Sequence, residues 1–266
     1  MSAALPTGGS DAWNAAALYA ALLVARLIPI VGFTPLFGGE ATSRRMRAGL
    51  ALLLAAPIAV VRSSPSILDL APATYALLVV KELVVGAAMA IAVLGVFEAL
   101  VAAGSLVDLG RGQSLAALVD PSTRQQVSPL ASFLRQASLV LFLTAGGYGA
   151  VASAFEDSIR VLPPSQLLPS LTGSDVLLET SLRVLPRMFL IAVRLALPVF
   201  AVSLVIDVAF GLLGRAASAF DLGQLSLPLR TALGLVVFLA TLQLAFSTAQ
   251  IDLAAGLGFV ASGLRW

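Results

Sequence analysis

The sequence predicts an all-α, multi-span helical membrane protein with long kinked helices and helical hairpins. Apolar residues make up 59% of the 266 residues and charged residues only 11%, which leaves too little polar surface to cover a water-soluble globule. The mean hydropathy of +1.00 agrees with this. Several apolar stretches are at least as long as the roughly 20 residues that a spanning helix needs.

The expected spans follow from these stretches in order. They are Ala12 to Leu36, Ala71 to Val107, Pro129 to Phe155, Val176 to Leu213 and Leu229 to Leu264. Ala48 to Val61 is apolar but short, which fits a half-span, a re-entrant element or a helix buried between neighbours. The second and fourth stretches exceed one crossing, so each must tilt, protrude or break. Gly86 and Pro198 are the expected breaks.

We predict a single membrane domain over residues 1–266. Its expected parts are N-terminal helices over 1–107, a polar loop over 108–128, a central helix over 129–161, a Pro/Ser-rich loop over 162–175 and a C-terminal helical hairpin over 176–266. The connecting segments are recognised by their turn-forming and polar residues.

Composition excludes several classes of function. The chain has no histidine and no cysteine, which removes the usual zinc, haem, iron-sulfur and Ser-His-Asp sites. Its acids lie in unrelated contexts, so no pair is placed for general acid and base chemistry. The basic residues are dispersed, without the stripe and interleaved aromatics of a nucleic-acid site. We therefore expect a protein that is not an enzyme and uses no cofactor or metal.

Single charges lie deep in the apolar stretches at Arg26, Lys81, Glu82, Glu98 and Asp207. Each would cost roughly 2.5 to 3.5 kcal/mol at the centre of a bilayer if it were unpaired. Lys81 and Glu82 diverge by about 100° on a helix, so we expect neither to be the main partner of the other. Other helices, or other polypeptides, are expected to complete these charges.

A row of charges lies on the fourth stretch. Glu179, Arg183, Arg187 and Arg194 are spaced by four, four and seven residues, which keeps them on one face of a helix. This stripe could contact acidic neighbours or a wet conduit. It could equally be a helix end at the lipid headgroups, from which arginine side chains extend to water.

The most distinctive passage is the polar loop between two long apolar stretches. Asp108 and Arg111 are three residues apart and can pair on a helix. Gly112 allows a sharp change of direction, and Asp120-Pro121 turns the chain away from helical geometry. Loops of this length within a helical membrane protein are uncommon and often functional.

These residues resemble the FliR/SctT family of type III secretion export-apparatus proteins. Its central motif is similar to Arg111-Gly112, Ala116, Asp120-Pro121 and Ser128-Pro129-Leu130. Its other blocks resemble Arg26 with Pro35 and Phe37-Gly38, Arg44 to Arg47 with Gly49 to Leu52, Lys81-Glu82 with Gly86, and Asp207 to Arg215 with Pro228-Leu229. The resemblance covers nearly the whole chain, and the central motif resembles the injectisome branch more than the flagellar one.

The resemblance implies a core subunit of the export gate, multi-pass in the bacterial inner (cytoplasmic) membrane. The expected partners are the FliP/SctR-type and FliQ/SctS-type subunits, with which it would form a channel for unfolded secreted proteins. The FlhB/SctU-type switch protein and membrane lipid are expected as well, and nucleic acid is not. In that family, the central loop contributes to a plug that closes the channel at rest.

Carried onto this chain, the plug and its base would comprise Gly110, Arg111, Gly112, Leu115, Leu118, Val119, Asp120, Pro121, Ser128 and Pro129. Its apolar side chains are expected to seal against neighbours, while its glycines and proline act as hinges. The charges expected to be buried or to hold the assembly together are Arg26, Lys81, Glu82, Arg183, Arg187, Arg194, Asp207 and Arg215.

Two alternatives stay open. The loop could be a structural connection without a gating role. The chain could also be an ion-coupled secondary transporter of a small solute, because buried acids such as Glu82 and Asp207 mark ion-coupled sites. A transporter would favour paired halves with matching interrupted helices, and the sequence does not display them.

Overall fold

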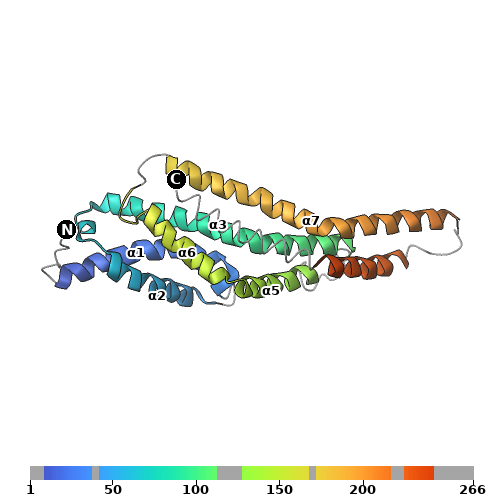
Figure 1. Ribbon diagram of the computed structural model, residues 1–266, viewed down its shortest axis with the longest axis horizontal. Coiled ribbons are helices and arrows are strands. Elements are labelled where there is room, and N and C mark those ends of the chain that lie inside the picture. Colours follow the sequence, from blue (N-terminus) through green and yellow to red (C-terminus); the bar gives the residue numbers. More distant parts are fainter. Residues whose placement is uncertain (1–8, 38–41, 113–127, 168–171, 217–224, 243–266) are drawn as a thin grey trace. The chain divides into compact units, whose positions relative to one another are not determined.

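The computed structural model describes residues 9–37, 42–112, 128–167, 172–216 and 225–242 (Figure 1). These residues form helices and turns but no strand. The helices are α1 (Gly9–Phe33), α2 (Arg44–Arg62), α3 (Pro72–Gly110), α5 (Pro129–Thr144), α6 (Gly147–Val161), α7 (Thr172–Ala216) and a last helix, Leu225–Leu242. Two short 3₁₀ turns, η1 (Pro35–Phe37) and η3 (Pro65–Ile67), flank α2.

The predicted all-α membrane fold is confirmed. Among the described residues, four helical segments are long and apolar enough to cross a membrane: Ser10–Phe33, Pro72–Gly110, Met188–Arg215 and Leu225–Leu242. The pair α5 and α6 is apolar enough to form a further, broken span. The chain is thus built as a multi-pass membrane protein.

The chain divides into two compact units. Among the described residues, the first unit holds 9–37, 42–94, 149–167 and 172–183, and the second holds 95–112, 128–148, 184–216 and 225–242. The helices α3 and α7 each contribute one part to each unit.

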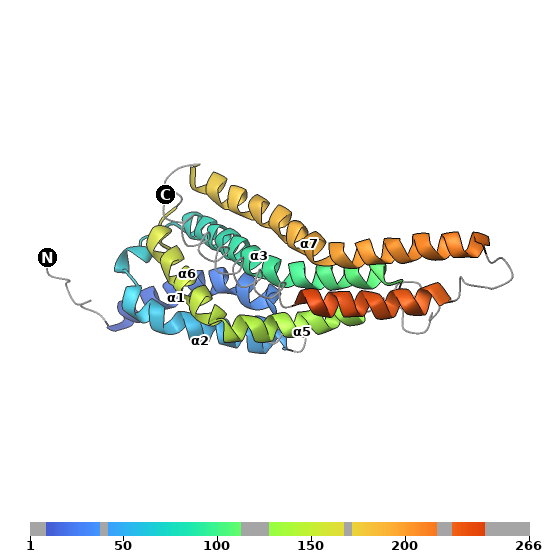
Figure 2. The same ribbon diagram turned by 45° about the vertical axis from the view of Figure 1, so that its right-hand side comes forward.

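In the first unit, α1, α2 and α6 lie side by side in both views (Figures 1 and 2). Ser43 caps the N-terminus of α2, where its Oγ accepts a hydrogen bond from the backbone N–H of Met46 at 3.3 Å. The buried residues of α2 are Ala51, Ala55 and Ala59, spaced by four. This helix therefore packs through small side chains that permit a close approach.

The expected break of α3 at Gly86 is wrong, because α3 runs unbroken from Pro72 to Gly110. A Cβ at Gly86 would lie 2.1 Å from the carbonyl oxygen of Arg26. Glycine is therefore required here by the close approach of α1 to α3, and its helix-breaking tendency is overridden.

The expected break at Pro198 is also wrong. The helix α7 continues through Pro186 and Pro198, as membrane helices do when neighbouring groups satisfy the freed carbonyls. The stretch expected as one central helix over 129–161 is instead two helices, α5 and α6. Gly146 separates them with a φ of 75°, a left-handed conformation that favours glycine.

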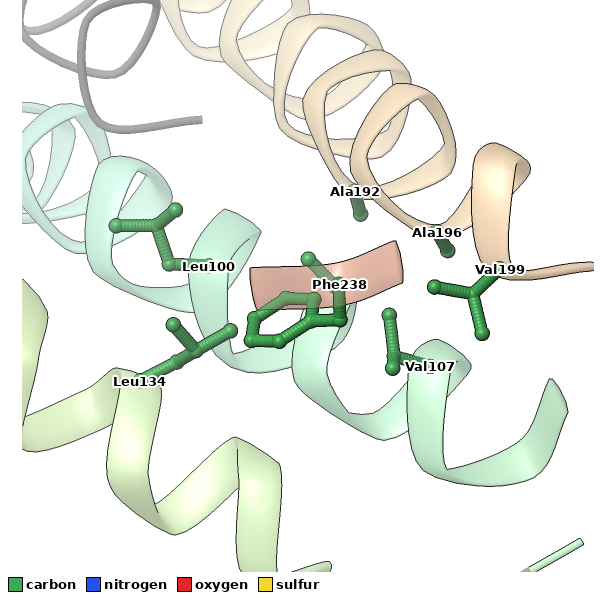
Figure 3. Close-up of a cluster of buried hydrophobic side chains, with 8 residues drawn as sticks. Leu100, Val107, Leu134, Ala192, Ala196, Val199 and Phe238 are labelled. Carbon is green, nitrogen blue, oxygen red and sulfur yellow. The ribbon is translucent and has the colours of Figure 1, made fainter. Parts of the chain in front are cut away.

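The core of the second unit is a cluster of buried side chains from α3, α5, α7 and the last helix (Figure 3). Its members are Leu100, Ala103, Val107, Leu134, Ala192, Ala196, Val199 and Phe238. Close to it, α3 and α5 nearly touch, because a Cβ at Gly104 would lie 2.7 Å from Cα of Ala131. This packing brings the end of α3 close to the start of α5, where the second of the two charge clusters described below lies.

Candidate functional site: two clusters of buried charge

The first cluster, in the first unit, is centred on an ion pair between α1 and α3. The Arg26 guanidinium binds both carboxylate oxygens of Glu82, with Nε donating to Oε2 and Nη2 donating to Oε1 at 3.0 Å. Both residues are fully buried. The fork geometry of arginine matches the carboxylate, which makes this a strong, charge-assisted contact.

Lys81 joins the same carboxylate, since its Nζ lies 2.8 Å from Oε1 of Glu82. The expectation that neither neighbour is the main partner of the other holds for Glu82, whose two oxygens bind Arg26, and is wrong for Lys81, whose ion pair is with Glu82. The two Cα–Cβ bonds do diverge, but the long lysine stem allows the ammonium to reach back. Its remaining protons bind backbone carbonyls, with distances of 2.9 Å to Pro163 and 2.8 Å to Gln166.

The first cluster fastens the chain that follows α6. Besides Glu82, Arg26 donates to Oγ of Ser158 at 2.9 Å and to the carbonyl of Leu162 at 2.8 Å. The last carbonyls of a helix have no partner within the helix and carry partial negative charge. Two cations and one carboxylate thus satisfy this helix end and its exit turn from within the chain.

The second cluster, in the second unit, lies at the base of the central loop. Asp108 and Arg111 pair as predicted, with 3.1 Å between Arg111 Nη1 and Asp108 Oδ1. The other oxygen of Asp108 accepts from Oγ of Ser128 at 2.6 Å and from the backbone N–H of Leu130 at 2.9 Å. One buried carboxylate therefore connects the end of α3 with the start of α5.

Ser128 and Pro129 have a clear local role. Ser128 is the N-cap of α5, and its Oγ accepts from the backbone N–H of Ala131 at 3.1 Å. Pro129 is the first residue of the helix, where its missing N–H costs nothing. The Ser-Pro-Leu passage is thus a helix start that also offers Asp108 two donors.

The last helix binds the end of α3 through two residues. The backbone carbonyl of Thr231 accepts from Nε of Arg111, and the Thr231 hydroxyl donates to the Arg111 carbonyl, each at 3.2 Å. Arg230 donates from Nε to the carbonyl of Gly110 at 2.7 Å. Its Nη1 lies 3.2 Å from Oδ1 of Asp207 on α7.

Two glycines make room for this arrangement. A Cβ at Gly234 would lie 2.6 Å from Cγ of Arg111, so the last helix can approach the arginine stem only with glycine there. Gly112 follows the end of α3 with a φ of 78°, a left-handed conformation that favours glycine; the sharp change of direction expected there stays a prediction, because residues 113–127 lie outside the described residues. Gly110, expected as a hinge, is the last helical residue, and its carbonyl is held by Arg230.

Several predicted residues cannot be placed. Leu115, Leu118, Val119, Asp120 and Pro121 lie outside the described residues, as do the side chains of Glu179, Arg183 and Arg187. Arg194 and Arg215 are exposed, and neither forms an ion pair with another described residue.

Of the two sources expected to complete the buried charges, the chain itself supplies the partners in the described cases, and other polypeptides are not needed there. Arg26, Lys81 and Glu82 satisfy one another, and Asp207 pairs with Arg230. Glu98 pairs with Arg135 at 3.2 Å in a half-exposed position. Arg230 and Thr231 were not among the predicted residues, because no local pattern indicates them. The N-cap role of Ser128 could have been predicted, because a Ser-Pro pair before an apolar run is a helix-start signature.

The whole chain was compared with known protein families. The family described as bacterial export proteins, family 1, matches residues 17–255. The chain belongs to this family. The predicted resemblance to FliR/SctT proteins is thereby confirmed at the level of the family, and the two clusters are features of a bacterial export protein with several membrane spans.

Some relatives of this export protein are named for flagellar biosynthesis, and others for surface presentation of antigens or translocation of Yop proteins. The flagellar biosynthetic protein FliR of Escherichia coli K12 is 26% identical over 224 residues, 82% of each chain. The surface presentation of antigens protein SpaR of Salmonella typhimurium is 28% identical over 248 residues, 92% of this chain and 89% of the relative. The Yop proteins translocation protein T of Yersinia pestis is 27% identical over 160 residues, 60% of each. The preference for the injectisome branch stays a prediction, since these identities are similar.

Proposed function

We propose that this chain is a core subunit of a type III secretion export gate in the bacterial inner membrane. There it forms, with FliP/SctR-type and FliQ/SctS-type subunits, a channel through which unfolded proteins pass. The observation that carries the proposal is the family match over residues 17–255, nearly the whole chain. The names of the relatives, which refer to flagellar biosynthesis and to translocation of Yop proteins, support export as the shared activity.

The exposed C-terminal spans support assembly with other subunits. Within this chain, 61% of an apolar 18-residue stretch of Ser10–Phe33 is buried. The buried share of the corresponding stretch is only 28% in Met188–Arg215 and 11% in Leu225–Leu242. Side chains such as Phe189 and Val205 are 70% and 68% exposed. These faces need apolar cover from lipid or from helices of other subunits. We assign part of them to the FliP/SctR-type and FliQ/SctS-type subunits and expect the FlhB/SctU-type switch protein to bind the assembled gate.

We further propose that the loop between Gly112 and Ser128 closes the channel at rest. This role comes from the family resemblance. It is supported by Asp108, which fixes both the end of α3 and the start of α5, so that the two ends of the loop are anchored to one carboxylate.

Composition of the complex is the first test. The complex is extracted from its own membrane and weighed by native mass spectrometry, with this chain carrying an affinity tag. We expect one copy of this chain with several copies of two smaller apolar subunits. A tagged chain that is isolated alone, and that binds a small solute, would contradict the export gate and favour a transporter.

Permeability is the second test. Deleting residues between Gly112 and Asp120 should make the assembled complex leak small ions or fluorescent dyes across the membrane at rest. The Glu98→Gln variant is a matched control, because it alters a half-exposed ion pair on the same helix. Unchanged permeability of an assembled, loop-shortened complex would reject the gating role.

The transporter alternative loses its main support. It relied on Glu82 and Asp207 as ion-coupling acids, and both are paired with arginines of the same chain.

The branch of the system is the finer part of the proposal. We favour the injectisome branch, because Arg111-Gly112 and Ser128-Pro129-Leu130 resemble it. Deleting the gene in its own host should abolish secretion of injectisome substrates and leave swimming motility intact. Loss of motility with secretion intact would assign the chain to the flagellum.

A further inference from the structure

The contacts around Asp108 form one continuous row through four helices of the second unit. The row starts at Asp207 on α7, which pairs with Arg230 on the last helix. Arg230 holds the carbonyl of Gly110, and the neighbouring Arg111 pairs with Asp108. Gly110 and Arg111 are joined by the backbone, and each other step is a hydrogen bond or ion pair of 3.2 Å or less.

The far end of the row is electrostatically unusual. Asp108 lies in the last turn of α3, where the helix dipole disfavours an anion. The same carboxylate lies at the N-terminus of α5, where it accepts the otherwise free N–H of Leu130 and the hydroxyl of Ser128. Asp108 is 4% exposed. The dipole of its own helix therefore disfavours its charge, while α5 and the Arg111 guanidinium stabilise it, so the link to α5 contributes to keeping this anion buried.

The two ends of the row differ in strength. The end of α3 is held to the last helix by contacts of Gly110 and Arg111 with Arg230 and Thr231. By contrast, α7 packs on these helices through the apolar side chains of Ala192, Ala196 and Val199, and its ion pair with the last helix is half-exposed, with side-chain exposures of 43% for Asp207 and 26% for Arg230. Solvent-accessible pairs are weak and easily exchanged. This end can therefore respond to whatever touches the exposed face of α7.

We propose that this row is a relay, in which the position of α7 sets the separation between the end of α3 and the start of α5. Asp207, Arg230 and Asp108 are its positioning residues. The use of the relay to control resting permeability rests on the proposed function, whereas its existence is a mechanical property that distances can measure. A contact made on α7 would be transmitted by Arg230, which cannot follow Asp207 without pulling on Gly110.

The separation of α3 and α5 can be measured with two spin labels. The chain has no cysteine, so Leu109→Cys and Phe133→Cys would be the labelled positions. Their parent side chains are 51% and 53% exposed. The distance distribution is recorded in the co-purified complex by pulsed electron resonance, so that only assembled protein contributes.

Three variants test the relay. Asp207→Ala removes the contact with α7, and we expect the distribution to shift or broaden by roughly 1 to 2 Å, the size of ordinary helix shifts. Ser128→Asp keeps a good N-cap but opposes Asp108 with a like charge, and should broaden it at least as much. Glu98→Gln removes another pair between α3 and α5 without touching the row, and should change nothing.

The double variant of Ser128→Asp and Asp207→Ala shows whether both substitutions act through the same row of contacts. When Ser128→Asp has already separated α5 from Asp108, adding Asp207→Ala should produce no further change, because residues in one network are not additive. An unchanged distribution in Asp207→Ala alone would overturn the relay. Effects of the two substitutions that simply sum would overturn it as well.

Resting leak separates the relay from the proposed function. Asp207→Ala should raise the leak of the assembled complex by up to several-fold, on the order of the effect of losing one half-exposed ion pair. The loop-shortened complex serves as the leaking reference. If that reference does not leak, the proposed gating role is rejected, while the distances between the two spin labels still test the relay. If the reference leaks and Asp207→Ala does not, the regulatory use is overturned and the gate stands.

Discussion

The charges of the first cluster are buried and satisfied within the chain, whereas the contacts of the second cluster extend to a half-exposed ion pair. Arg26 and Glu82 are fully buried, and their acceptors and donors are taken up by one another, by Ser158 and by backbone carbonyls. In the second unit, Asp108 is nearly buried, but the row that contains it ends at the half-exposed Asp207.

The difference separates a structural role from a regulatory one. A dry, fully satisfied ion pair stabilises one arrangement and resists change, because removing either partner leaves an uncompensated charge. A row that ends at an exposed pair can be altered from outside at small cost. Substitutions should therefore unfold the protein through the first cluster and change its conformation through the second.

The largest effect is expected for Glu82→Leu. This change removes the carboxylate shared by Arg26 and Lys81, and two buried cations lose their counter-charge. We expect the free energy of unfolding to fall by about 3–5 kcal/mol, measured by denaturation in mixed detergent micelles. The triple variant Arg26→Met, Lys81→Met and Glu82→Leu should be more stable than Glu82→Leu alone. Equal instability of the two would show that packing, not charge, causes the loss.

A steric test of the first unit comes next. In Gly86→Ala, the new Cβ would lie 2.1 Å from a backbone oxygen of Arg26, so α1 and α3 must separate. We expect a loss of about 1–3 kcal/mol in the same unfolding measurement. Gly49→Ala is the matched control, because nothing lies within 4 Å of its Cβ position, and a helical Gly→Ala change then stabilises slightly. Identical behaviour of the two variants would contradict the close approach.

Arg111→Met probes the second cluster in the same terms. Asp108 would keep its bonds to Ser128 and Leu130, so the loss should be smaller than for Glu82→Leu. About 1–3 kcal/mol is expected for one charged hydrogen-bond partner, again from unfolding in mixed micelles. A loss as large as that of Glu82→Leu would mean that both clusters have the same structural role.

The smallest effect is expected for Glu98→Gln. Its pair with Arg135 has side-chain exposures of 31% and 53%, and such pairs contribute below about 1 kcal/mol. The unfolding curve and the resting permeability should both stay close to those of the unchanged protein. A marked destabilisation would show that exposure in the isolated chain underestimates burial in the assembly.

Local chemistry allowed part of this molecule to be predicted from its sequence. The apolar stretches predicted the spans, because length and composition decide whether a helix can cross a membrane, and the spacing of Asp108 and Arg111 predicted their pair, because it depends only on helical periodicity. Gly112 was predicted to turn the chain because glycine accepts a positive φ at low cost. The family resemblance extended over nearly the whole chain for the same reason: its motifs are local.

Tertiary packing decided the rest. Gly86 could be a break or a point of close approach, and only the position of α1 shows which it is. The partners of Glu82 and Asp207 lie 56 and 23 residues away, and no sequence spacing indicates them. Lys81 illustrates a further limit, since the direction of a Cα–Cβ bond does not fix where a flexible four-carbon chain places its charge.

The alanine face of α2 bears on how this protein should be handled outside its membrane. Helices in lipid gain no hydrophobic energy by associating, so a surface of methyl groups adheres through dispersion and close fit alone. Short-chain detergents should therefore displace α2 from its helix interface more readily than they separate α1 from α3, which an ion pair also joins. Gentle long-chain surfactants or polymer-bounded lipid discs are therefore the media in which α2 should stay attached to α1 during purification.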